Sequence, residues 1–175
     1  ARVHEIAKPR PAMTQTLTAS LKVLDDFETL QGWKKIASDG VRLDTALVAG
    51  RTNRGLKLEF DFVAGAGYCG VQKQLPLTLP ENFQFSFYLR GTAPINNFEF
   101  KLVDASGDNV WWRNQRNFEF PENWTKITIK KRHIEFAWGP TNDRALKNLD
   151  KIEFFIASST GGKGAVCLDD FTFEA

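Results

Sequence analysis

The chain has 175 residues, a formal net charge of +2 and 42% hydrophobic residues. This length fits one domain, and the apolar content is too high for a disordered chain. The first 22 residues contain four basic side chains and one acidic side chain, so the rest of the chain is close to neutral. Phosphate neutralisation needs a basic face, and a membrane helix needs about 20 apolar residues in a row. We therefore expect neither a nucleic-acid partner nor a membrane partner.

The N-terminal segment differs in composition from the rest of the chain. Residues 1–20 contain two nearby prolines and a polar run at residues 13–20, and they show no apolar period. We expect a linker or tail at residues 1–20 and one folded domain at residues 21–175. The chain does not open with a charged-then-apolar signal sequence. Two explanations stay open: a signal peptide was removed, or the chain is a piece of a longer protein.

From Leu21 onward, apolar and polar residues alternate with a period of two, which is typical of strands with one face in a core. Turn residues separate about ten such runs, and 15 Phe and 5 Trp favour sheets over helices. The pattern predicts an all-β sandwich or barrel, with a short helical turn near residues 144–148. A slip in the alternation at Asp169–Asp170 indicates a bulge. The clearest rows lie at residues 56–62, 83–89, 98–102, 127–129, 152–156 and 166–173.

The two cysteines, Cys69 and Cys167, each lie inside an expected strand beside apolar residues. Neither has a second Cys or a His near it at the spacing of a zinc site. We expect two buried free thiols, with a single disulfide as the alternative.

Acidic residues gather at the two ends of the domain, where Asp26 and Glu28 stand near the start and Asp170 near the end. First and last strands often pair in antiparallel sandwiches, and carboxylates brought together repel unless a cation lies between them. Calcium accepts six to eight oxygens, including carbonyl and amide oxygens, so the loop around Asn53 is a further source of ligands. We expect structural calcium at Asp26, Glu28, Asn53 and Asp170, and the alternative is a set of solvated turn acids.

Adjacent tryptophans occur in Val110-Trp-Trp-Arg113, so one indole must point away from the core of a strand. Because valine suits the core better, we predict that Trp111 and Arg113 point outward. Glu99 and Lys101 alternate with an apolar row on the preceding strand and should also point outward.

Two further aromatics fit an exposed surface. Tyr68 has the opposite parity to Cys69, which should be buried, and Trp138 lies in a long irregular stretch. Aromatic faces stack on sugar rings while acids, amides and basic groups bind hydroxyls. This group of residues predicts a sugar-binding face, and the alternative is ordinary packing of each aromatic.

The sequence contains no nucleophile-elbow motif, no glycine-rich phosphate loop and no paired-histidine motif. Glu99, Glu135 and Glu153 could share a face, as the carboxylates of a glycoside hydrolase do, but a domain with this many acids offers such pairs by chance. We expect no enzymatic activity, with a small polysaccharide-degrading enzyme as an alternative.

Five motifs spread over the folded domain point to a family. They are Leu24-Asp-Asp-Phe-Glu28 followed by Trp33, Arg51-Thr-Asn-Arg-Gly55-Leu56, Gly67-Tyr68, Leu149-Asp-Lys-Ile-Glu-Phe154 and Leu168-Asp-Asp170. Together they resemble the carbohydrate-binding modules of family 11, over roughly residues 23–175. A mitochondrial complex I assembly factor family has a similar opening and a related fold, which keeps a protein-binding adaptor open as a second alternative.

The resemblance implies a β-sandwich jelly roll of two antiparallel sheets that binds a glucan chain on a concave sheet face. It implies a stacking role for Tyr68, a place for His133 near the binding site, and calcium-binding roles for Glu28 and Asp170. Two stacking tyrosines of the family are replaced, one by Ile36 or a neighbour and one by Ile156.

We therefore expect a non-catalytic, monomeric module that binds a β-glucan-like polysaccharide. The resemblance implies secretion, or a periplasmic location, and a covalently linked glycoside hydrolase. The residues expected to bind the sugar are Tyr68, Glu99, Lys101, Trp111, Arg113, His133, Trp138 and Glu153.

Overall fold

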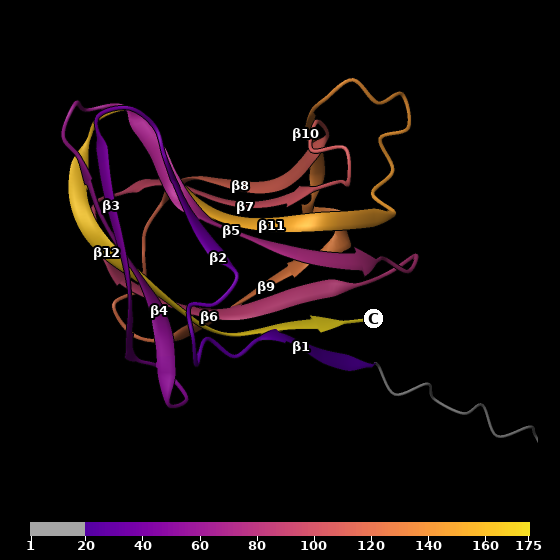
Figure 1. Cartoon of the computed structure of the whole chain (residues 1–175), viewed down its shortest axis with the longest axis horizontal. Coiled ribbons are helices and arrows are strands. Elements are labelled where there is room, and N and C mark those ends of the chain that lie inside the picture. The colour runs from indigo at the N-terminus through magenta and orange to yellow at the C-terminus, as the bar shows by residue number, and fades with distance from the viewer. Residues whose placement is uncertain (1–19) are drawn as a thin grey trace, which may run out of the picture.

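The computed structural model describes residues 20–175, and these form twelve strands with one short 3-10 turn (Figure 1). The expected tail at residues 1–20 therefore lies almost wholly outside the described residues. The elements are β1 (Leu21–Asp25), β2 (Trp33–Ala37), β3 (Val41–Ala49), β4 (Arg54–Phe62), β5 (Gly67–Thr78), β6 (Gln84–Thr92), β7 (Asn96–Val103), β8 (Val110–Phe118), β9 (Thr125–Lys130), η1 (Lys131–His133), β10 (Glu135–Trp138), β11 (Asn148–Ser158) and β12 (Gly162–Glu174).

Two antiparallel sheets make up the two layers visible in Figure 1. Sheet A has the strand order β3-β4-β12-β6-β9, and β1 pairs with the C-terminal part of β12. Sheet B has the order β10-β8-β7-β11-β5-β2. The loop between β10 and β11 rises beyond sheet B on the side away from sheet A (Figure 1). The prediction of an all-β sandwich with the jelly-roll architecture is confirmed.

Phenylalanines from both sheets fill the space between them. Phe85 and Phe171 of sheet A are fully buried, as are Phe100 and Phe154 of sheet B. The ring centroids of Phe85 and Phe100 lie 5.2 Å apart, and those of Phe154 and Phe171 also lie 5.2 Å apart. Each large apolar side chain removed from water contributes about 1.5–3 kcal/mol to folding. These interlocking rings therefore fix the two sheets against each other and hold the outer faces in register.

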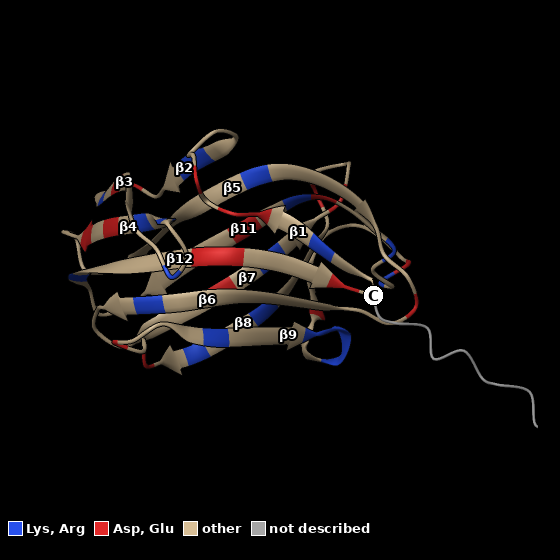
Figure 2. Ribbon diagram, turned by 90° about the horizontal axis from the view of Figure 1, so that it is seen from below, with Lys and Arg blue, Asp and Glu red and all other residues tan. Residues whose placement is uncertain are grey.

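The predicted bulge is present in β12. The pairing of β12 with β6 shifts register between Asp169 and Thr172, and Asp170 has a φ of 48°. The first part of β12 pairs with β4 and the last part with β1, so the bulge lies where β12 exchanges one neighbour for the other. Leu168 and Phe171 are both fully buried in the core, so the two acidic residues between them lie on the outer side of sheet A, and the red band on β12 in Figure 2 marks their place.

The structure also tests the predictions made for the two cysteines and for a short helical turn. Both cysteines are free and buried, as expected, with Cys69 in sheet B and Cys167 in sheet A. The helical turn expected near residues 144–148 is wrong, because residues 139–147 form a loop that leads directly into β11. The 3-10 turn instead follows β9 at Lys131–His133. Within residues 20–175, no helix has the length and apolar character that crossing a bilayer requires.

Candidate functional site

The outer face of sheet B, the face turned away from sheet A, carries most of the residues expected to bind sugar. Residues directly opposite one another in a sheet share a face. Lys101 of β7 lies opposite Glu153 of β11 and Trp112 of β8, while Glu99 lies opposite Phe155 and Asn114. The face includes Lys34, Ile36, Tyr68, Gly70, Gln72, Asn97, Glu99, Lys101, Val110, Trp112, Asn114, Trp138, Glu153 and Phe155.

Charged side chains lie at the centre of this face with little exposure to solvent. Glu99, Lys101 and Glu153 are 7%, 7% and 8% exposed. Charges with so little solvent need partners, because an unpaired charge out of water is strongly unfavourable. Lys101 Nζ lies 3.2 Å from Glu99 Oε1, and Gln72 Nε2 donates a 2.8 Å hydrogen bond to Glu153 Oε2. The centre of the face is thus an ordered polar floor.

Aromatic rings flank this floor on the β5 and β11 side. The rings of Tyr68 and Phe155 stack with centroids 6.1 Å apart and planes 22° apart. Phe155 lies across Gly70, where a Cβ would stand 2.4 Å from Phe155 Cδ1. Glycine at this position therefore lets the phenylalanine ring lie against the strand, a known way of covering an exposed glycine in a sheet.

A second aromatic pair flanks the floor on the β8 and β10 side. Trp112 and Trp138 have ring centroids 5.3 Å apart and planes at 86°. Lys101 Nζ lies 5.7 Å from the centroid of Trp138, on the outer face. Tyr68 and Trp138 are each 47% exposed. The two therefore present open aromatic surface on the same face, one on each side of the charged floor.

Five of the eight predicted sugar-binding residues lie together here, and three do not. Trp111 and Arg113 point to the other side of β8, so the prediction that they face outward is wrong. Trp111 pairs with Leu102 in the core, and its Nε1 donates a 2.7 Å hydrogen bond to the carbonyl of Arg144. Val110 is also buried, but its side chain lies on the outer face. The assumption that this valine points into the core is therefore wrong. The five residues on the face are Tyr68, Glu99, Lys101, Trp138 and Glu153.

His133 lies at the corner between the sheets, in the turn that joins β9 to β10. Its Nδ1 accepts a 3.0 Å hydrogen bond from the backbone N–H of Lys130. Partial burial lowers the pKa of His133, and the nearby positive charges of Arg113, Arg132 and Lys130 lower it further. The ring thus acts as a structural acceptor at this corner, away from the charged floor.

Several residues of the face escaped the sequence reasoning. Ile156 is fully buried in the core and takes no part in the outer face, while Phe155, one residue before it, lies on that face. Adjacent aromatics hid both Phe155, next to Phe154, and Trp112, next to Trp111. Lys101 points outward in the sequence pattern, and Trp112 lies opposite it where β8 pairs with β7. This pairing would have identified Trp112 as a residue of the outer face.

The acids expected to bind calcium approach one loop from two sides. Glu28 Oε1 accepts a 3.2 Å hydrogen bond from the backbone N–H of Arg54, and Asp170 Oδ2 accepts a 3.1 Å bond from the Thr52 hydroxyl. Arg51 Nη1 lies 3.4 Å from the same Asp170 oxygen. Between residues 20 and 175, no three His, Cys, Asp or Glu side chains gather as a metal-binding group.

The donor set of this loop fits calcium in kind, because carboxylate, hydroxyl and carbonyl oxygens are the ligands it prefers. Two carboxylates alone do not complete six to eight ligands, so backbone and Asn53 oxygens would supply the others. The Asp26 side chain bonds to the nearby backbone, where its Oδ1 accepts a 3.1 Å hydrogen bond from the Glu28 N–H. Asp169, fully buried, accepts from the N–H groups of Thr52 and Asp170, and burial raises its pKa.

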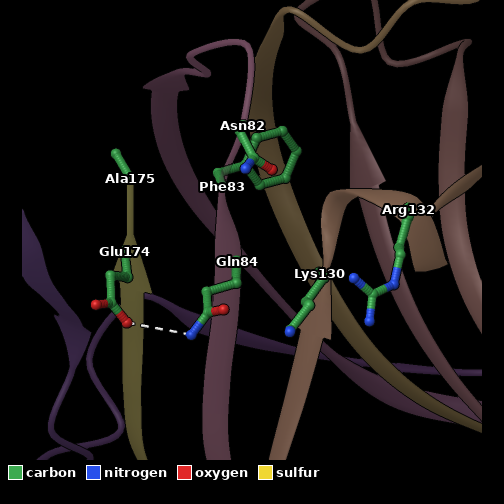
Figure 3. A pocket seen from close by; sticks show the side chains of 7 residues that line it. All are labelled: Asn82, Phe83, Gln84, Lys130, Arg132, Glu174 and Ala175. Atoms are coloured by element: carbon green, nitrogen blue, oxygen red, sulfur yellow. Dashed lines mark hydrogen bonds between the residues drawn. The ribbon is translucent and has the colours of Figure 1, made fainter. Parts of the chain in front are cut away.

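A separate cavity of about 360 Å³ lies where β6, β9 and the end of β12 meet (Figure 3). Glu174 is held by a 3.1 Å hydrogen bond from Gln84 Nε2, and the side chains of Lys130 and Arg132 line the opposite wall. The blue turn after β9 in Figure 2 marks this basic segment. The one aromatic among the lining residues, Phe83, is 4% exposed, so the cavity lacks the open aromatic surface found on sheet B.

Comparison with known proteins places this fold beside carbohydrate-binding modules. The family 11 carbohydrate-binding module of the cellulosomal cellulase Lic26A-Cel5E of Clostridium thermocellum has a TM-score of 0.70 and 24% identity, over 89% of this chain and 95% of that chain. A family 11 module from the same organism, in complex with a β-1,3-1,4-mixed-linked tetrasaccharide, has a TM-score of 0.69 and 24% identity, over 87% and 94% of the two chains. The fold of this protein is therefore that of the family 11 modules.

More distant likenesses extend to parts of larger enzymes. An exo-β-agarase structure has a TM-score of 0.59 and 17% identity, over 86% of this chain and 24% of that chain. No protein-family model matches the sequence. Endoglucanase H of Acetivibrio thermocellus is 26% identical over 159 residues, which cover 83% of this chain. The chain spans about 17% of the length of this curated relative.

Proposed function

We propose that residues 21–175 form a non-catalytic module that binds a polysaccharide on the outer face of sheet B. The observation that carries this proposal is the position of Tyr68 and Trp138. Both aromatic side chains are 47% exposed, and both lie on one face, on either side of a charged floor. Exposed aromatic surface is unfavourable in water, and sugar rings cover such surface with their C–H groups.

The polar floor favours a ligand rich in hydroxyl groups. Glu99 uses one oxygen in its ion pair with Lys101 and Glu153 uses one in its hydrogen bond with Gln72, while a carboxylate can accept about four hydrogen bonds. Acceptors of this kind are complemented by donors, which the hydroxyl groups of a sugar supply. Two acids and one base lie at the centre and Lys34 lies at the β2 edge, so the face carries as many acids as bases and has no basic excess to attract an anionic polymer. We therefore favour a neutral polysaccharide.

The choice of a β-glucan follows from the structural likeness. The family 11 module that shares this fold was solved with a mixed-linked β-1,3-1,4 tetrasaccharide. Endoglucanase H, which this chain matches over about 17% of its length, supports the further proposal that the module accompanies a glycoside hydrolase in a longer secreted protein.

Affinity electrophoresis in gels that contain single polysaccharides tests this function. We expect retardation by mixed-linkage β-glucan or another neutral glucan, and no retardation by alginate or pectate, which are anionic. Release of reducing sugar from the same glucans should equal that of a protein-free control. A Trp124→Ala variant serves as the control for variants that remove an aromatic ring from the proposed face. Trp124 packs against Arg90 of sheet A and does not lie on that face.

Two results would contradict the proposal. If neutral polysaccharides, agar included, leave the mobility unchanged, the outer face of sheet B does not bind sugar, and protein partners become the next class to test. If sugar release exceeds the control and disappears in a Glu99→Gln or Glu153→Gln variant, the domain is an enzyme.

A further inference from the structure

Aromatic side chains are unevenly distributed across the outer face of sheet B. At the β2 edge, Lys34 lies opposite Gln72 and Ile36 lies opposite Gly70, so this edge offers no aromatic ring. At the β8 and β10 edge, two indoles contact each other. If sugar rings stack on this face, the opportunities lie on the β8 and β10 side and at Tyr68.

The two indoles differ from Tyr68 in the surface that they offer. One face of the Tyr68 ring is already stacked on Phe155, so only its other face is free. Trp112 and Trp138 stand at 86° to each other, with centroids 5.3 Å apart. Two perpendicular rings form a corner, in which a sugar that stacks on one indole also contacts the other. The corner therefore offers more contact to one sugar unit than a single free ring face does.

Lys101 of the charged floor lies beside this corner and contacts Trp138. Its Nζ lies 3.2 Å from Glu99 Oε1, 3.9 Å from the centroid of Phe155 and 5.7 Å from the centroid of Trp138. An ammonium over the face of an aromatic ring is attracted by the negative charge of that face. The ammonium is thus engaged with protein groups in three directions, and Lys101 acts as a positioning residue for the indole.

A polar group beside the corner lacks a partner. Asn114 lies two residues from Trp112 on β8, and its Oδ1 is buried without a hydrogen-bond donor. The terminal torsion of asparagine is broad and roughly two-fold, so a half-turn of the amide exchanges its oxygen and nitrogen at little cost. The turn would place Nδ2 at the buried position and bring Oδ1 to the position that Nδ2 now holds, as an acceptor for a ligand hydroxyl.

From these observations we infer that the principal sugar-binding subsite lies at the Trp112–Trp138 corner, with Asn114 as its hydroxyl acceptor, and that Tyr68 forms a secondary subsite. The inference rests on the proposed function and specifies where on the face the polysaccharide makes its main contact. The ligand class is a neutral pyranose unit within a chain long enough to reach from β10 across the floor to Tyr68. Contacts of 5.7 Å from Trp138 to Lys101 Nζ, 3.9 Å from Lys101 Nζ to Phe155 and 6.1 Å from Phe155 to Tyr68 link the two subsites, so their ring centroids lie within about 16 Å of each other.

Titration with the glucan oligosaccharide that binds the unmodified protein tests the ranking of the subsites. Truncation of a stacking ring costs on the order of 1–3 kcal/mol by analogy with aromatic–base stacking, and 1.4 kcal/mol is tenfold in affinity. We expect Trp138→Ala to weaken binding at least about tenfold, Trp138→Tyr to recover much of it, and Tyr68→Ala to weaken it less. Trp124→Ala, on sheet A, should leave the affinity unchanged.

Tryptophan fluorescence supplies a readout that does not depend on affinity. At saturating oligosaccharide, stacking on the corner should change the emission of the unmodified protein and of Tyr68→Ala, but the change should be lost in Trp138→Ala. Asn114→Ala should weaken binding by a few fold, while Asn82→Ala, in the exposed loop between β5 and β6, should have no effect.

Failure of the subsite and failure of the proposed function give different results. If the unmodified protein binds and Tyr68→Ala abolishes binding while Trp138→Ala and Asn114→Ala bind normally, the principal subsite is at Tyr68 and the inference is wrong. If the unmodified protein binds no glycan of the panel, the proposed function fails and the inference fails with it. Melting temperatures of the variants, measured in parallel, identify any that lose binding because they unfold.

Discussion

Lys101 Nζ lies 3.9 Å from the centre of the Phe155 ring, while the same ammonium lies 3.2 Å from Glu99 Oε1. The side chains of Lys101 and Glu99 are each 9% exposed. Because little water reaches the pair, each charge relies on the other and on the aromatic ring for stabilisation. The pair therefore supports the fold of sheet B as well as the arrangement of the proposed site.

Removal of the ammonium should leave Glu99 as an uncompensated, nearly buried charge. We expect Lys101→Met to lower the free energy of unfolding by about 3 kcal/mol, as breaking one side of a buried ion pair usually does. The double variant Glu99→Gln/Lys101→Met should recover most of this loss, because no charge is left unpaired. Urea unfolding of the unmodified protein and of the two variants measures both effects.

A matched control exists on the opposite sheet. Lys57 and Glu59 have the same spacing on one strand and are 3.0 Å apart, but their side chains are 31% and 60% exposed. Lys57→Met should change the stability by no more than about 0.5 kcal/mol, as exposed pairs contribute little. Equal losses for Lys57→Met and Lys101→Met would contradict the role given to burial.

The thiols should be unreactive in the folded protein. Burial raises the pKa of Cys69 to about 12, and burial also raises that of Cys167, against the lowering effects of Arg90 and Lys57. Since the thiolate is the reactive form, an aromatic disulfide reagent at pH 8 should label neither thiol in native protein and both in denaturant. If one thiol reacts slowly, Cys167→Ser should abolish that reaction. Rapid native labelling of Cys69 would contradict the buried position.

The alternation of residues predicted the strands and their core rows because a single buried face leaves a clear period of two. Phe98, Phe100 and Leu102 point into the core, and Glu99 and Lys101 point away from it, as the sequence indicates. The same rule failed one strand later. Val110 and Trp111 are both buried, on opposite faces of β8, so alternation could not tell the core side from the outer side.

The arrangement of the candidate site depends on contacts between strands far apart in sequence. The corner of Trp112 and Trp138 forms because β10 pairs with β8 through a shifted register between Phe136 and Trp138. The stacking of Tyr68 on Phe155 depends on the pairing of β5 with β11. Single-strand patterns contain neither pairing, so the sequence could nominate residues for the site without giving their geometry.

We propose that calcium binds between Glu28 and Asp170, with oxygens of the Thr52–Asn53 loop. Such an ion would tie the loop after β1 to the bulge of β12. A ligand that binds only the native state at a hundredfold excess over Kd stabilises it by about 2.7 kcal/mol. We therefore expect a chelator to lower the melting temperature and added calcium to restore it. Asp170→Asn should abolish this response, while Asp39→Asn, in an exposed turn, should keep it. Identical melting curves with chelator and with calcium would contradict the proposal.

His133 should make the folded state less stable in mild acid. Its pKa lies below the ordinary value of 6.5 in the folded protein, because of burial and the charges of Arg113, Arg132 and Lys130. As the pH falls through about 6.5, the unfolded chain takes up a proton at this position before the folded chain does, so the free energy of unfolding decreases. Protonation of Nδ1 would also end its role as acceptor for the Lys130 N–H.

His133→Asn retains an acceptor without a titrating group, so melting temperatures between pH 7.5 and 5 should fall less steeply in this variant. His4 lies outside the described residues and is common to both proteins, so it does not affect the comparison. Parallel pH profiles for the two proteins would show that His133 titrates alike in the folded and unfolded states.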